Sequence, residues 1–164
     1  MKKTYFAAAV LLLSYGTVRA ADQPFMKEGL WSTHDVDITN PGNKLSDSTN
    51  KICRSHAWEQ QVQVESKKVM KSCTVLSDTT EGNKHLTETK CQISGITLTT
   101  KAVVTILNED SVHSETHTTY SPSMGNLSDE TSIRDQKYLG SCPTGISPGD
   151  MVLSDGTVRH LWKH

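Results

Sequence analysis

The sequence predicts a mainly β protein, in which an antiparallel meander forms a twisted sheet or a partly closed barrel, with one short helix after the first cysteine. Stretches of alternating apolar and polar residues recur between turn signals and are rich in Thr, Ser and Val, whereas aromatic residues make up only 5% of the chain. The chain also begins with an export signal and contains four cysteines, which is typical of an exported domain held by disulfides.

The first 20 residues have the order of a secretory signal peptide. Lys2 and Lys3 form a positive start, residues 6–13 are an unbroken apolar run, and small residues precede the expected cleavage point after Ala20. The apolar run is too short to cross a bilayer, which takes about 20 residues. We therefore expect cleavage near Ala20 and a periplasmic or secreted protein, with no membrane span in the mature chain.

Length and charge limit what the mature chain can be. We place one β domain with two disulfides at 21–143, and we expect an extended C-terminal arm at 144–164, where Gly and Pro interrupt the alternation. The whole chain has a formal net charge of −1 and its leader is basic, so the mature part has a charge of about −4. This balance argues against nucleic acid as a partner, because phosphates attract a basic patch.

The first half of the domain combines strands with the expected helix. Alternation predicts a strand at 30–38, which ends at a turn in 40–43, and a short strand follows at 50–53. Ser55 is a suitable N-cap for a helix from 56 to about 65.

The second half is predicted to form two hairpins and a final strand. The expected strands are 69–76, 85–93, 97–107, 111–120 and 131–139, with a loop at 121–129. Centring the second turn on Glu109 pairs Ile106 with Val112 and Val104 with Ser114 on the inward face. This face is small and partly hydroxylated, so it either lines a modest cavity or packs beneath bulkier neighbours.

The four cysteines are expected to form two disulfides. Cys73 and Cys91 lie at equal distances from Gly82, the centre of the first hairpin turn, and directly opposed strand residues are close enough for a disulfide. Cys53 and Cys142 then remain as the second pair. A bulge of one residue in the hairpin would break this pairing.

Short motifs along the mature chain resemble a family of small exported bacterial proteins catalogued as domain of unknown function 3617. The motifs are Gly29-Leu30-Trp31, Ile52-Cys53, Tyr138-Leu139-Gly140-Ser141-Cys142-Pro143 and Pro148-Gly149-Asp150-Met151, with Cys73 and Cys91 between them. The resemblance implies an exported location, the cysteine framework and β structure. It implies no activity, since the family has none established.

Few residues suggest chemistry. His113, Glu115 and His117 share one side of a strand and have donor atoms suited to a first-row metal, but alternate strand residues lie about 6.6–7 Å apart, which makes convergence on one ion unfavourable. Trp31 and Trp58 are large apolar groups that either belong to the core or form the wall of a ligand site.

The sequence therefore favours a non-catalytic binding or envelope-associated module that takes a small apolar ligand or another envelope protein. No nucleophile motif, phosphate-binding loop or free cysteine supports an enzyme, and we expect no cofactor. The alternatives are a periplasmic metal-binding protein that uses the two histidines and Glu115, and a hydrolase whose residues assemble only in the fold.

Overall fold

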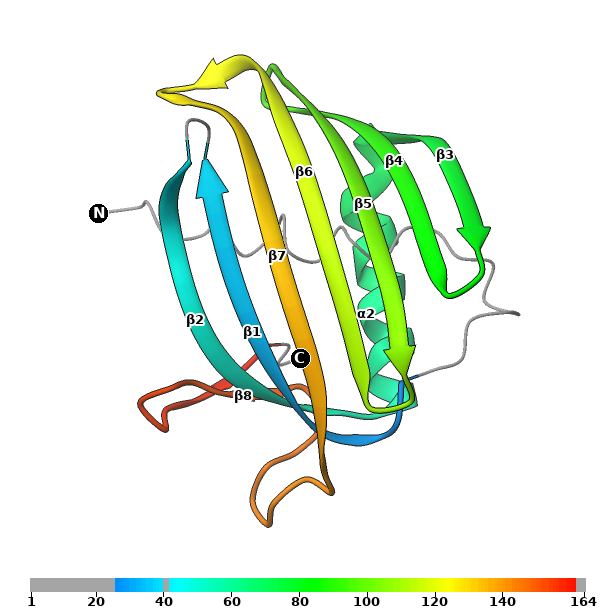
Figure 1. Cartoon of the computed structure of the whole chain (residues 1–164), viewed down its shortest axis with the longest axis vertical. Coiled ribbons are helices and arrows are strands. Elements are labelled where there is room, and N and C mark those ends of the chain that lie inside the picture. Colours follow the sequence, from blue (N-terminus) through cyan, green and yellow to red (C-terminus); the bar gives the residue numbers. More distant parts are fainter. Residues whose placement is uncertain (1–25, 40–41, 162–164) are drawn as a thin grey trace.

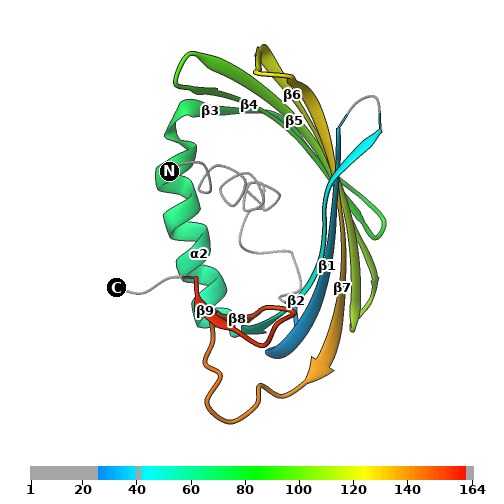
Figure 2. The same ribbon diagram turned by 90° about the vertical axis from the view of Figure 1, so that its left-hand side faces the viewer.

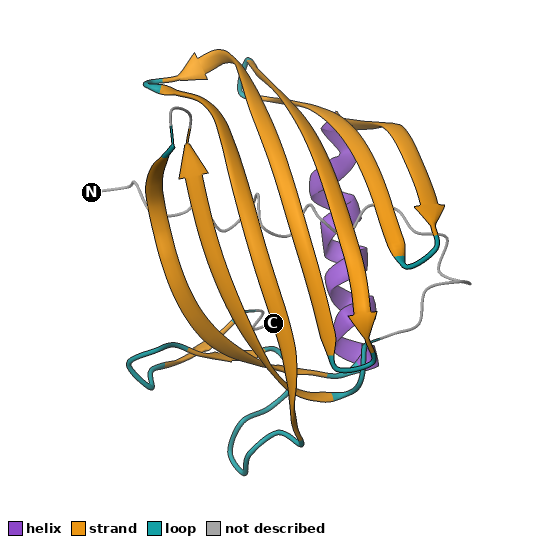
Figure 3. Cartoon of the chain, viewed as in Figure 1, coloured by secondary structure: helices purple, strands orange, loops and turns teal. Residues whose placement is uncertain are grey.

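A computed structural model describes residues 26–39 and 42–161, and it confirms the expected mainly β class with one α-helix (Figures 1 and 3). The elements are β1 (Gly29–Thr39), β2 (Asn43–Arg54), α2 (His56–Val69), a 3₁₀ turn (Met70–Ser72), β3 (Cys73–Glu81), β4 (Lys84–Ile93), β5 (Ile96–Asn108), β6 (Ser111–Met124), β7 (Leu127–Gly140), β8 (Asp150–Val152) and β9 (Val158–His160). The predicted signal peptide at 1–20 lies outside the described residues. None of the described helical segments is long and apolar enough to cross a bilayer.

The nine strands in the described part of the chain belong to one antiparallel sheet with the order β3-β4-β5-β6-β7-β1-β2-β8-β9. Strands β3 to β7 form the expected meander, and the hairpin β1–β2 joins it because β1 pairs with β7 along nearly its whole length. The sheet does not close, since its edge strands β3 and β9 do not pair with each other, and β2 is joined to β3 through α2. Figure 2 shows a strongly curved sheet with α2 on its concave side.

The helix begins where the sequence predicts and ends later. The Ser55 hydroxyl accepts a hydrogen bond from the backbone N–H of Trp58 at 3.2 Å and so caps the first turn. The helix then continues to Val69, four residues past the expected end, and Lys67 and Lys68 lie in its last turn, where positive charge is favourable. The predicted start of the next strand at residue 69 is therefore wrong, and β3 starts at Cys73 after the 3₁₀ turn.

Three other segments contain more strand than expected. Strand β2 begins at Asn43, seven residues before the predicted start, and it pairs with β1 over its full length. The loop predicted at 121–129 is wrong, because β6 extends to Met124 and β7 starts at Leu127 around a tight turn. The stretch 144–164 carries the two short strands β8 and β9, of which β8 pairs with β2 at Lys51 and Ile52.

The predicted disulfides, Cys73–Cys91 and Cys53–Cys142, are both confirmed. The register that joins the hairpin pair has two offsetting irregularities. The turn is centred between Gly82 and Asn83, because Glu81 pairs with Lys84, and this register alone would misalign the cysteines by one residue. A bulge at Leu76 restores the alignment, so Cys73 lies opposite Cys91.

The two faces of the sheet differ in burial, and Trp31 identifies the one that α2 covers. The Arg54 guanidinium lies 5.9 Å from the centroid of the Trp31 ring, and its Nε donates to the Glu59 carboxylate of α2 at 2.7 Å. We call the side that carries Trp31 the inner face and the opposite side the outer face. The prediction for β5 and β6 is confirmed, since Ala102 and Val112 are buried on the inner face while their neighbours Lys101 and Glu115 are exposed on the outer face.

Candidate binding face

The inner face is lined mainly by small hydroxylated side chains. Its buried residues of this kind are Thr33, Thr87, Thr89, Thr100, Ser114, Thr116 and Thr118, contributed by β1, β4, β5 and β6. Cross-strand register places them in adjacent rows, and Thr100 and Thr118 share a hydrogen bond of 3.1 Å between their hydroxyls. A hydroxyl that leaves water without a partner costs free energy, so rows of buried hydroxyls favour contact with polar groups.

Apolar groups occupy the two ends of the inner face. At one end the rings of Trp31 and Tyr138 lie 5.5 Å apart between centroids. At the other end Cys91, Leu98 and Tyr120 form a small buried cluster. The inner face is thus apolar at both ends and polar in its middle.

Charged side chains from β1 and β7 mark the polar middle. Arg134 Nε donates to Asp35 Oδ1 at 2.5 Å, and both side chains are mostly buried. Asp37 accepts hydrogen bonds on both carboxylate oxygens, from Ser132 Oγ at 2.5 Å and from Ser46 Oγ at 2.6 Å. These charged groups can be buried because each of them is paired or hydrogen-bonded.

Glu130 extends this polar middle towards the second apolar end. Its carboxylate accepts a hydrogen bond from the Tyr120 hydroxyl at 3.2 Å. Burial, followed by repulsion from the Asp37 carboxylate, raises the pKa of Glu130 above its ordinary value. Burial, reinforced by the Glu130 charge, likewise raises the pKa of Tyr120. Proton release from either group is therefore less favourable here than in water.

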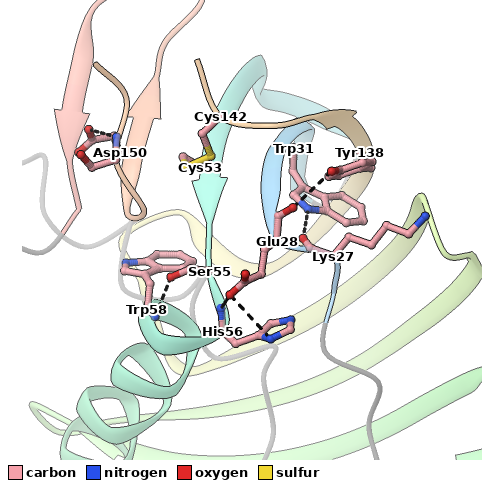
Figure 4. Close-up of a disulfide and its surroundings, with 11 residues drawn as sticks. Lys27, Glu28, Trp31, Cys53, Ser55, His56, Trp58, Tyr138, Cys142 and Asp150 are labelled. Atoms are coloured by element: carbon pink, nitrogen blue, oxygen red, sulfur yellow. Dashed lines mark hydrogen bonds and ion pairs between the residues drawn. A yellow bond between two sulfur atoms is a disulfide. The ribbon is translucent and has the colours of Figure 1, made fainter. Parts of the chain in front are cut away.

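The two predicted wall residues contact different parts of the molecule (Figure 4). Trp31 is fully buried, and its indole Nε1 donates to the backbone oxygen of Lys27 at 2.8 Å. Trp58 lies in the first turn of α2, and its indole packs so closely on Gly149 that a Cβ there would lie 2.6 Å from Nε1. Their role as a ligand wall remains a prediction.

The predicted metal residues lie on the outer face of β6, away from the inner face. His113 Nδ1 lies 2.7 Å from an oxygen of Asp135, and His117 Nδ1 lies 3.1 Å from the hydroxyl of Thr131, so the two imidazoles have separate partners on β7. Within 26–39 and 42–161, no group of three or more His, Cys, Asp or Glu side chains is arranged to hold a metal ion.

Sequence reasoning missed the charged middle of the inner face. One local signal existed, because Asp35 and Asp37 alternate on the same side of the first strand as Trp31. Their partners are distant in sequence, since Arg134 lies 99 residues after Asp35 and Ser132 lies 95 residues after Asp37. Only the pairing of β1 with β7 brings them together.

No family model, curated protein or solved structure matches this chain, so the chemistry of the candidate face rests on its own residues.

Proposed function

We propose that this chain is an exported, non-catalytic binding protein of the bacterial envelope, and that the inner face of its sheet is the ligand surface. The leader at 1–20 supports export. Two disulfides fit an oxidising compartment such as the periplasm. Membership of the exported family that the motifs resemble belongs to the same proposal.

The observation that carries this proposal is the hydroxylated inner face. A helix usually packs on a sheet through large apolar side chains that interdigitate at the density of a protein interior. Among the described residues, α2 contributes one buried apolar side chain, Val62, and the middle of the sheet opposite it carries Thr, Ser and charged groups. Such a face is poorly suited to bind the helix alone and well suited to a separate molecule with polar groups.

The arrangement of the face favours a small amphiphilic ligand over a purely apolar one. The aromatic pair at one end and the Tyr120 cluster at the other offer apolar contact. The hydroxyl rows and Arg134 between them offer hydrogen bonds that fix orientation. A purely apolar ligand would match the two ends of the face but would make no polar contact with its hydroxylated middle.

Two variants of adjacent threonines test the proposal. Thr118 is 2% exposed on the inner face, whereas its neighbour Thr119 is exposed on the outer face of the same strand. The protein is purified from the periplasm without denaturation, and small molecules extracted from it are identified by mass spectrometry. We expect a bound compound that is lost in Thr118→Phe and retained in Thr119→Phe.

Thermal unfolding of both variants shows whether they fold. If Thr118→Phe is unfolded, Thr118→Val takes its place, because it removes the hydroxyl with little change in volume. Equal retention in the inner and outer variants would contradict the proposal. So would a wild-type preparation that carries no compound and retains none from a periplasmic small-molecule extract.

A further inference from the structure

A second concave surface lies on the outer face, where the C-terminal hairpin joins the sheet. Strand β8 pairs with the end of β2, and the turn between β8 and β9 lines the same surface. Together they enclose an open groove of about 350 Å³, within the range of small-ligand sites. The groove is lined by Thr49, Lys51, Val152, Leu153, Ser154 and Gly156. It is separate from the inner face, because Lys51 precedes Ile52, which lies opposite Trp31 on the inner face.

The walls of the groove are held in place by backbone hydrogen bonds. Leu153 N donates to the oxygen of Thr157 at 2.9 Å, and Gly156 N donates to the oxygen of Leu153 at 2.9 Å, so the turn is closed on itself. Gly149 N donates to the oxygen of Cys53 at 2.8 Å, beside the disulfide to Cys142, and this anchors the start of β8 on β2. A groove built this way needs little ordering when a ligand binds, which favours affinity.

The chemistry of the groove is apolar with one cation. Val152 and Leu153 provide aliphatic walls, and the Lys51 ammonium has no hydrogen bond or ion pair with the described residues. By contrast, Lys44 bonds to Asp47 at 2.6 Å and Lys101 lies 3.8 Å from Glu88 on the same outer face. Lys51 is therefore a positive charge available to a ligand.

Acidic residues around the groove are engaged elsewhere. Asp155 Oδ1 accepts the backbone N–H of Thr157 at 2.8 Å, and this bond lowers the pKa of the Asp155 carboxyl. Asp47 bonds to Lys44 and to His34. Asp155 keeps its own charge, but neither of these carboxylates pairs with Lys51, so the ammonium is open to a negative group that enters the groove.

We propose that this groove binds a small aliphatic carboxylate, with the carboxylate at the Lys51 ammonium and the hydrocarbon chain along Val152 and Leu153. The hydroxyls of Thr49 and Ser154 lie in the same lining and can donate to the carboxylate. This site does not depend on the inner face, so each of the two ligand surfaces can fail its test without affecting the other.

The test is an NMR titration of the isotope-labelled mature protein with octanoate. We expect saturable shifts at residues of β8 and of the turn after it. Replacing the charge in Lys51→Gln should weaken binding about tenfold or more, because a charge-assisted hydrogen bond is lost. Octanol, which keeps the chain and lacks the charge, should bind the wild type about tenfold more weakly or worse.

Lys90→Gln is the matched control, because it removes the same charge from an exposed position on β4, across the sheet from the groove. Its affinity for octanoate should equal that of the wild type. Unchanged binding in Lys51→Gln, equal binding of octanol, shifts confined to the inner face, or no binding up to about 10 mM would each overturn the proposal. Leu153→Ser should weaken octanoate and octanol alike, since it shortens the apolar wall without changing the charge.

Discussion

The two disulfides should differ in how much they stabilise the fold, and the structure allows the difference to be worked out. Replacing the Cys53/Cys142 pair by alanine releases a link between residues 89 apart, whereas replacing Cys73/Cys91 releases a link between residues 18 apart. In the chain-entropy model these loops are worth about 4.6 and about 3.2 kcal/mol at 25 °C. We therefore expect the long link to contribute about 1.4 kcal/mol more to the free energy of unfolding.

Packing losses should largely cancel in this comparison. Each pair combines one fully buried cysteine, Cys53 at 0% and Cys91 at 2% exposure, with a partly buried partner. The surroundings of the two disulfides also favour a larger contribution from the long link. That link fixes the end of β2, where the backbone N–H of Gly149 also donates to the oxygen of Cys53. The hairpin link instead joins an edge strand that already pairs with β4 along its length.

Urea unfolding followed by tryptophan fluorescence measures both double variants against the wild type. The free energy of unfolding is extrapolated for each variant with its own slope, because removing a cross-link lets the unfolded chain expand and steepens the transition. A hairpin variant that is as destabilised as the long-link variant, or more so, would refute the loop argument. Non-reducing peptide mapping of the wild type provides the control, and a peptide joining Cys53 to Cys73 would show that the strand register is wrong.

Three further predictions concern single residues. Gly149→Ala should lower the free energy of unfolding by about 2 kcal/mol or more, because a Cβ would lie 2.6 Å from Trp58 Nε1 at a φ of +91°; an unchanged melting temperature would contradict this. The raised pKa of Glu130 means that the folded state holds its proton more tightly, so the contribution of this group to stability is lost as the pH rises from 4.5 through the folded pKa. The change in the free energy of unfolding caused by Glu130→Gln, measured by urea unfolding against the wild type, should therefore be more favourable at pH 7 than at pH 4. The opposite trend would show that burial and the Asp37 charge do not raise the pKa of Glu130. Ser55→Ala should cost about 1 kcal/mol through loss of the helix cap, measurable by the same urea unfolding, and no loss would mean that water replaces the cap fully.

Local pattern was sufficient for the hairpins that close on short turns. Ile106 pairs with Val112 as predicted, although the turn is centred between Glu109 and Asp110, because a bulge at Leu107 offsets the turn by one residue. The Cys73–Cys91 register was predicted correctly although neither the turn centre nor the bulge at Leu76 was foreseen. Burial of one face requires every second residue of each strand to point inward. The alternation in the sequence therefore indicates which residues share the buried face, even when the turn is placed one residue away.

Local pattern failed where strand formation depends on a distant partner. Residues 43–50 are polar except for the exposed Leu45, and they become strand because β1 pairs with them along this stretch. Pro122 suggested a loop, yet the chain stays extended there, and the irregular register between Thr119 and Met124 accommodates the missing N–H. The pairing of Asp35 with Arg134 has no local trace, since it needs the contact between β1 and β7.

The helix between β2 and β3 explains why the sheet stays open. An open sheet has two free edges, and each of them needs protection from pairing with other chains. A tight turn after β2 would have continued the meander, whereas the Ser55 cap starts a helix that carries the chain across the concave side before β3 begins. An open sheet exposes unpaired backbone at its edges, which invites pairing with other chains. At the β3 edge the structure places the Leu76 bulge and the acids Asp78 and Glu81, devices that disfavour such pairing.

At the β2 edge, β8 and β9 extend the sheet by two short strands and cover β2 at Lys51 and Ile52. These strands are anchored next to the Cys53–Cys142 disulfide, so the long link keeps the edge cover in place. The same cover forms the groove beside Lys51. Loss of the long disulfide should therefore weaken octanoate binding and leave the inner face occupied, which separates the two ligand surfaces by a single covalent change.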